Sequence, residues 1–131
     1  MTYDENGTEY LYTTALPVLL DGKRTAGPVA MDMYTRHGVN PHWFGRGFSF
    51  SLAAYAQRHP LPAPLSALSD EILTQILLDF ASEHVGLLAL YPCSPEAEAF
   101  VARVAPSLES RYVILPLSVG SDPLAHLVRK A

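Results

Sequence analysis

The sequence has little cysteine, little charge and no long apolar stretch. One cysteine in 131 residues excludes an intramolecular disulfide framework and a zinc site built from several cysteines. No apolar run approaches the roughly 20 residues that a membrane-spanning helix needs. The N-terminus, Met1-Thr2-Tyr3-Asp4-Glu5, is acidic and lacks the basic and apolar order of a signal peptide. These absences lead us to expect a soluble protein in a reducing setting, most simply the cytoplasm.

Composition and length predict one packed domain over residues 1–131. Hydrophobic residues make up 49% of the chain and charged residues 17%, which favours a buried core over disorder. A length of 131 residues leaves little room for a second domain. The formal net charge of −4 argues against a broadly basic surface for nucleic acid, and it leaves a local basic patch open.

The first half of the chain favours strands. Residues 9–20 are rich in Tyr, Thr, Leu and Val, and residues 29–35 alternate in the way of a half-buried strand. The Asp21-Gly22 turn between them predicts an N-terminal hairpin. Residues 48–58 fit either a helix or a strand, and we favour the helix. The proline-rich stretch 59–64 is expected to run extended between the two halves of the domain.

The second half carries clearer signals. Ser69 and Ser94 each precede acidic residues and helical apolar spacing, which predicts N-capped helices, the second ending at Pro106. The apolar runs 85–91 and 112–117 are typical of buried strands, so residues 85–117 form a parallel, right-handed βαβ unit. A short helix is expected from Ser121. The predicted fold is α+β (mixed α/β): a single mixed sheet with an N-terminal hairpin, a C-terminal right-handed βαβ unit and covering helices, in the order ββααβαβα.

Cys93 is the candidate catalytic residue. It follows a buried strand and precedes the helix cap Ser94, where a helix N-terminus lowers the pKa of a thiol. No second cysteine or assignable base accompanies it, and His84 is expected at the opposite end of the neighbouring elements. The alternative is that Cys93 is a small buried hydrophobe, the usual state of a lone cysteine in apolar surroundings.

A second candidate is the stretch from Arg36 to Gly47, interpreted as a loop. Arginine side chains bind phosphate or carboxylate through two parallel hydrogen bonds, and aromatic side chains stack on planar rings. The alternative is a connecting loop with solvated arginines and a tryptophan in the core. The candidate binding residues of this stretch are Arg36, His37, His42, Trp43 and Arg46.

Charge is divided unevenly along the chain. Residues 23–59 contain five Lys or Arg residues against Asp32 alone, whereas residues 60–100 contain six carboxylates and no Lys or Arg. The second segment predicts an acidic face that docks on a basic partner. No metal-ligand spacing or cofactor motif is present, so we expect neither a metal nor a cofactor. The candidate residues of the acidic face are Asp70, Glu71, Asp79 and Glu83.

The residues and their spacing support two hypotheses of function. The first is a small acidic protein-binding or adaptor domain, of the immunity or antitoxin type, that recognises a macromolecular partner, most simply a protein, through its charged face. The second is a small cysteine-dependent enzyme or anion-binding domain that uses Cys93 and the Arg36–Arg46 loop. Nucleic acid and membrane are not expected as partners, and the exposed Met and aromatic residues expected on the hairpin leave a homodimer open.

Overall fold

The computed structural model describes residues 15–115. These residues form one five-stranded sheet with the strand order β3-β2-β1-β4-β5, and every neighbouring pair of strands is parallel. The expected mixed α/β class with a single sheet is confirmed. The strands are β1 (Ala15–Leu20), β2 (His42–Gly45), β3 (Gln57–Pro60), β4 (Leu87–Pro92) and β5 (Tyr112–Ile114).

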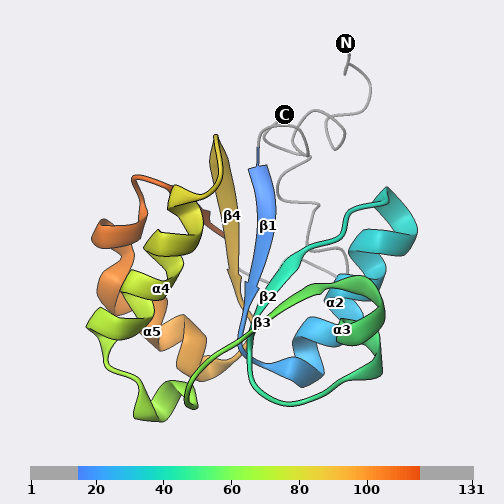
Figure 1. Ribbon diagram of the computed structural model, residues 1–131, viewed down its shortest axis with the longest axis horizontal. Helices are drawn as coiled ribbons and strands as arrows, with labels where there is room; N and C mark the ends of the chain where they lie inside the picture. The colour runs from blue at the N-terminus through green and yellow to red at the C-terminus, as the bar shows by residue number, and fades with distance from the viewer. Residues whose placement is uncertain (1–14, 116–131) are drawn as a thin grey trace.

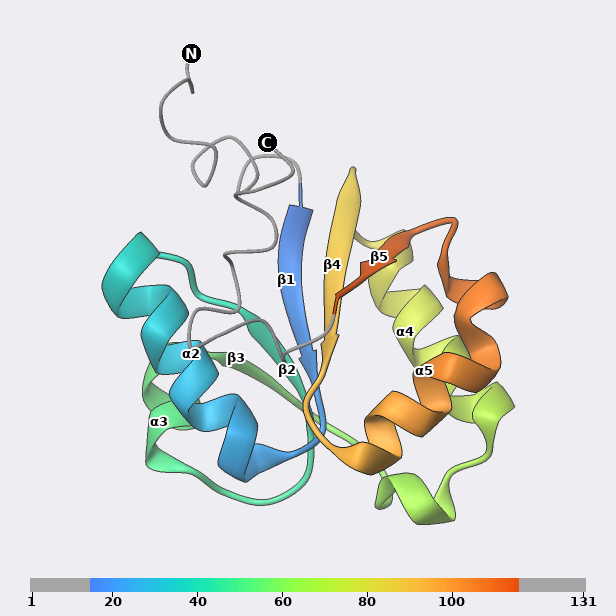
Figure 2. The same cartoon turned by 180° about the vertical axis from the view of Figure 1, so that it is seen from behind.

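Helices cover both faces of this sheet. Figures 1 and 2 show α2 and α3 on one face and α4 and α5 on the other, so the sheet is doubly wound. The chain changes face after β3, where a single turn of 3-10 helix, η1, precedes α4. The helices are α2 (Lys23–His37), α3 (Phe50–Tyr55), η1 (Leu65–Ala67), α4 (Asp70–Ser82) and α5 (Pro95–Leu108).

The two hydrophobic clusters explain why the central strands are apolar throughout. Successive side chains of a strand point to opposite faces, and here both faces are buried. Leu20 and Leu90 belong to the cluster under α4 and α5, whereas Leu19 and Ala89 belong to the cluster under α2 and α3. All four side chains are fully buried. The apolar run predicted as a strand over 85–91 is therefore confirmed as β4, with slightly shifted ends.

The predicted N-terminal hairpin is wrong, because residues 23–37 form a helix and β1 pairs only with parallel neighbours. The alternation over residues 29–35 is overridden by a helical stripe of Ala26, Ala30 and Met33, which are the residues buried against the sheet. Ala26 and Ala30 are small, so the helix packs closely against the sheet. Its buried face is therefore only slightly more hydrophobic than its exposed face. Left-handed Gly38, at φ 70°, ends the helix with its N–H donating to carbonyls of the last turn.

The element order consequently differs from the predicted ββααβαβα, and the described sheet is wholly parallel, not mixed. The ambiguous stretch 48–58 contains both structures, first α3 and then the beginning of β3. The parallel crossover from β4 through α5 to β5 is confirmed, although α5 continues past Pro106 to Leu108. The helix expected from Ser121 lies outside the described residues, as do residues 9–14 of the first predicted strand and residues 116–117 of the last.

The helix starts of the second half are confirmed at atomic detail. Ser69 Oγ accepts from the N–H of Ile72 at 3.2 Å, and Ser94 Oγ accepts from the N–H of Ala97 at 3.0 Å. Each cap satisfies a backbone donor that the helix itself leaves unpaired, which stabilises a helix by about 1 kcal/mol.

Strand β3 forms one edge of the sheet. The N–H of Gln57 donates to Pro41 O and that of Leu61 donates to Gly45 O, so alternate residues of this segment face β2. The backbone groups of Arg58 and Pro60 then point to the outer side of β3, where no further strand pairs with them among the described residues. Proline has no N–H to offer there. The outer side of β3 presents a single backbone donor, that of Arg58.

Candidate functional site

The candidate site lies where the chain leaves β1 and β4. These strands are parallel neighbours, but β1 leads into α2 on one face and β4 leads into α5 on the other (Figures 1 and 2). Loops that diverge in this way mark the switch point of the sheet, at the carboxyl ends of the strands, where open α/β sheets bind ligands. The first of these loops is Asp21-Gly22 and the second is Cys93-Ser94.

The Asp21-Gly22 turn adopts a backbone conformation that most residues avoid. Asp21 has φ 63° and Gly22 has φ 58°, both in the left-handed region. For most residues other than glycine this conformation costs about 1–2 kcal/mol, and aspartate adopts it more readily because its short side chain forms local hydrogen bonds. The surrounding structure compensates, since the N–H of Asp21 donates to Phe44 O at 2.7 Å and Trp43 Nε1 donates to Asp21 O at 3.0 Å.

The second loop is joined to the first by two hydrogen bonds. The N–H of Cys93 donates to Leu20 O at 2.9 Å, and Ser94 Oγ donates to Asp21 Oδ2 at 2.5 Å. The two loops also touch at Gly22, where an added Cβ would lie 2.0 Å from Cys93 O. The Ser94 hydroxyl thus caps α5 and also links the loop after β4 to the loop after β1.

The α2 side of this switch point carries positive charge. Left-handed Gly22 is followed by right-handed Lys23, an alternation that directs consecutive backbone N–H groups into one concavity suited to an anion. The first turn of α2 contains no acidic residue, and both Lys23 and Arg24 are exposed. An added Cβ on Gly47 would lie 2.9 Å from Lys23 Nζ, so this ammonium group lies beside the loop that follows β2.

A glycine spacing around α2 is the sequence signal that the strand prediction concealed. Gly22 permits the tight turn after β1, and Gly27 packs against the Ser49 side chain, with only 3.0 Å to an added Cβ. These are the first and last glycines of a Gly-x-Gly-x-x-Gly pattern, which marks phosphate-binding turns between a strand and a helix. Arg24 occupies the position of the middle glycine. The pattern is therefore incomplete here, and the guanidinium of Arg24 adds a positive charge where the pattern has no side chain.

The structure separates the residues predicted as one loop from Arg36 to Gly47. Residues 36 and 37 end α2, and residues 42–45 form β2, so only Arg46 reaches the carboxyl ends of the strands. The crossover explains this, because a helix between parallel strands returns the chain to the opposite edge of the sheet. Arg36 pairs with Asp32 at 2.8 Å, Trp43 is buried in the core, and Arg46 Nη1 donates to Leu61 O at 2.8 Å.

The carboxylates of the predicted acidic face lie on α4 or directly after it. Asp70 is engaged by Arg103 through two hydrogen bonds of 2.8 and 2.9 Å, which hold the pKa of its carboxyl below the usual value. Asp79 Oδ1 accepts from Gln75 Nε2 at 2.7 Å. Glu71 and Glu83 are exposed.

Cys93 lies in the second loop of the switch point, but its thiol faces the core. The residue is 5% exposed, and Sγ donates to Tyr91 O at 3.4 Å. Burial raises the pKa of the thiol to about 12, and the carboxylates of Asp21 and Glu98 act in the same direction. The expected lowering by the helix N-terminus is outweighed by desolvation. This geometry supports the interpretation of Cys93 as a small buried hydrophobe.

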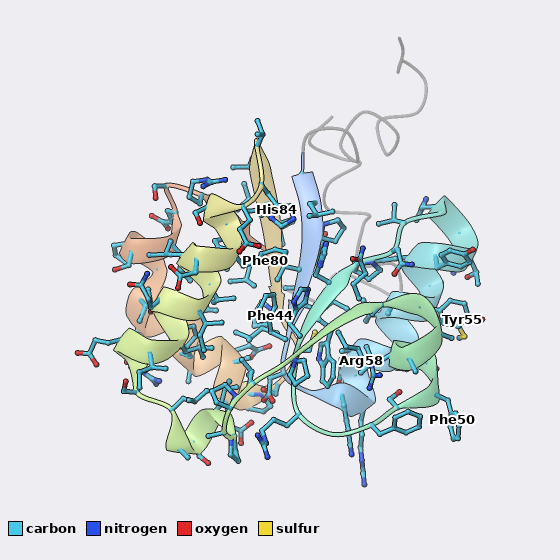
Figure 3. All side chains as sticks on the ribbon, viewed as in Figure 1. Phe44, Phe50, Tyr55, Arg58, Phe80 and His84 are labelled. Carbon is cyan, nitrogen blue, oxygen red and sulfur yellow. The ribbon has the colours of Figure 1, made fainter. Side chains whose placement is uncertain are left out.

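His42, His59 and His84 form a cluster that no spacing in the sequence reveals. His42 Nδ1 and His59 Nε2 are hydrogen-bonded at 2.8 Å, and the rings of His42 and His84 are 5.7 Å apart. Phe44 and Phe80 fill the space between them, with Phe44 stacked on His59 at 4.5 Å. Figure 3 shows Phe44, Phe80 and His84 in one column beside α4.

This cluster disfavours protonation. Burial, reinforced by His59 and His84, lowers the pKa of His42 to about 4, and burial and His84 also lower the pKa of His59. Within residues 15–115, no group of three or more His, Cys, Asp or Glu side chains has the geometry to hold a metal ion. The cluster is thus a neutral hydrogen-bonded pair with a third ring beside it.

Comparison with known proteins gives no family or relative. No family model, curated protein or solved structure matches the chain. Among the described helices, none combines the length and the apolar character needed to cross a bilayer.

We predict that Gly22→Ala destabilises the protein much more than Gly38→Ala. Both glycines have positive φ, so both variants carry similar backbone strain, but only the Gly22 variant places a methyl group against Cys93 O, with nothing within 4 Å at Gly38. The added clash lowers the free energy of unfolding by about 1–3 kcal/mol beyond the control. Urea denaturation of both variants measures this, and equal losses would contradict the close contact of the two loops.

Cys93 is predicted to be inert in the native protein. Because the thiol is buried and its pKa is about 12, iodoacetamide at pH 8 should modify it only after denaturant is added. Mass spectrometry of native and urea-unfolded samples measures the extent of alkylation. Rapid modification of the native protein would instead restore the catalytic interpretation of Cys93.

The histidine cluster predicts a loss of stability in acid. His42 takes up a proton near pH 6.5 in the unfolded chain and near 4 in the folded protein. The unfolded state therefore binds more protons between these values, and the free energy of unfolding falls as pH drops from 6.5 to 4, by up to about 3 kcal/mol. Urea denaturation across this range should show a shallower pH dependence for His42→Gln than for the control His37→Gln. Identical slopes for the two variants would contradict the contribution of His42 to this acid sensitivity.

Proposed function

We propose that this protein binds a small anionic ligand, carrying phosphate or carboxylate, at the switch point between the β1 and β4 loops. The observation that carries the proposal is the Asp21-Gly22 turn, a left-handed conformation that four hydrogen bonds in and around the two loops hold in place. Unusual backbone conformations of this kind accumulate at ligand-binding sites, where a rigid backbone lowers the cost of binding.

The charge on the α2 side of the switch point supports an anion over a cation. Lys23 and Arg24 begin α2, and Arg46 follows β2 at the same edge of the sheet. Oδ2 of Asp21 is already engaged by Ser94, and the carboxylates of Glu96 and Glu98 lie on the α5 side, in the first turn of that helix. The helix dipole adds positive potential at the same point.

The proposal uses no chemical step at Cys93. The thiol points into the core, toward Tyr91 O, and not toward the surface over the two loops. It is protonated at neutral pH. The backbone of Cys93 nonetheless shapes the site. Its N–H donates a hydrogen bond to Leu20 O, and its carbonyl oxygen leaves no room for a side chain at Gly22. A binding domain therefore fits these residues better than a cysteine-dependent enzyme.

Binding of inorganic phosphate to the full chain tests the proposal. Titration calorimetry at low salt should detect binding that weakens as ionic strength rises. Lys23→Ala/Arg24→Ala should weaken binding about tenfold or more, because charge-assisted hydrogen bonds contribute about 1.5–3 kcal/mol each. Arg36→Ala is the matched control, since Arg36 lies on the same helix at its other end. An unchanged affinity in the double variant would exclude this site.

The acidic adaptor remains a second candidate on one observation. The carboxylates of residues 70–98 lie on the layer of α4 and α5, whereas the cations of residues 23–58 lie on the layer of α2, α3 and β3. A protein partner with a basic surface fits the first layer. Asp70 contributes least to this face because Arg103 neutralises it. A cytoplasmic setting belongs to both candidates, and a homodimer stays a prediction.

A further inference from the structure

Two phenylalanine rings stand exposed beside the proposed anion site. Phe48 is 54% exposed and Phe50 is 84% exposed, although large aromatic side chains are usually covered. Their centroids are 5.0 Å apart, and the rings are nearly perpendicular, with an interplanar angle of 82°. Figure 3 shows Phe50 pointing away from the protein at the beginning of α3.

The same loop brings positive charge to these rings. The guanidinium carbon of Arg58, on β3, lies 5.8 Å from the centroid of Phe48. Gly47, directly before Phe48, lies beside the Lys23 ammonium group. Because β1 and β2 are parallel neighbours, the loops that follow them open on the same edge of the sheet. The rings and the anion site are therefore adjacent parts of one surface.

We infer that the ligand is a mononucleotide, with its phosphate at the start of α2 and its base stacked on Phe50, the more exposed ring, with Phe48 perpendicular beside it. This inference rests on the proposed function and adds the class of ligand. Base stacking on exposed aromatic side chains is tolerant of sequence and contributes strongly to affinity, and a neighbouring guanidinium strengthens it.

Two features favour a mononucleotide over a dinucleotide. The middle glycine that lets a diphosphate approach the backbone is replaced by Arg24. The end of β2 carries Arg46 in place of the carboxylate that binds the ribose hydroxyls of NAD. Side-chain cations can instead meet a terminal phosphate group.

Titration of the full chain with AMP, ribose 5-phosphate and adenosine tests the inference. Ribose 5-phosphate keeps the phosphate but lacks the base, and adenosine keeps the base but lacks the phosphate. AMP should bind about tenfold or more tightly than ribose 5-phosphate, within the range of stacking on an aromatic side chain. In Phe48→Ala/Phe50→Ala that preference should be lost while ribose 5-phosphate binds as before. Both side chains are exposed, so the variant is expected to fold.

Tyr34→Ala is the matched control, because Tyr34 is also exposed but lies toward the other end of α2. It should keep the full preference for AMP. Equal affinities for AMP and ribose 5-phosphate would overturn the inference and leave the proposed function standing. A preference for AMP that survives in the double phenylalanine variant would also overturn it. Failure of both phosphates to bind would overturn the proposed function together with the inference.

Discussion

Asp21 is the residue on which the carboxyl edge of the sheet depends. Its N–H and carbonyl are held by the β2 segment, through Phe44 and Trp43, and its carboxylate is held by Ser94 after β4. Three parallel strands are thereby fixed relative to one another at their ends, by a residue whose own conformation is unfavourable. The buried Trp43 ring has its polar atom satisfied by the same contact, as a buried indole requires. The local strain is offset by interactions from elements far apart in the chain.

The charges and rings at this edge follow from this arrangement. Fixing the Asp21-Gly22 turn fixes the direction in which α2 leaves the sheet, and with it the positions of Lys23 and Arg24. The loop after β2 then lies against Lys23, which places Phe48 near the start of α2, and Arg58 lies over the Phe48 ring. Cations and aromatic rings share one end of the molecule for topological reasons, since parallel strands send all their outgoing loops to the same edge.

The second half of the fold was predictable because its signals are local. Ser69 and Ser94 cap helices within three residues of themselves, and residues 88–91 of the predicted apolar strand are buried on both faces. The first half was not, because α2 buries the small residues Ala26 and Ala30 and leaves Met31 exposed, which mimics a period of two. Once α2 is known to be a helix, the spacing of Gly22 and Gly27 becomes readable.

The candidate site was predictable only in fragments. The sequence identifies Arg46 and the edge position of Cys93, but it leaves the burial of the thiol open. The contact between Ser94 and Asp21 joins residues 73 positions apart, and only the strand order brings them together. The histidine cluster likewise needs β2, β3 and the end of α4 to converge. Sequence periodicity carries no information of that kind.

Strand β3 has a consequence for how molecules of this protein meet at high concentration. A parallel or antiparallel strand from another copy would need donors and acceptors in register along the outer side of β3. Pro60 removes one of the outward donors, and the charged side chain of Arg58 accompanies the other. A second copy that approaches this edge therefore meets a like charge and a gap in the ladder, which makes β3 a poor template for a further strand.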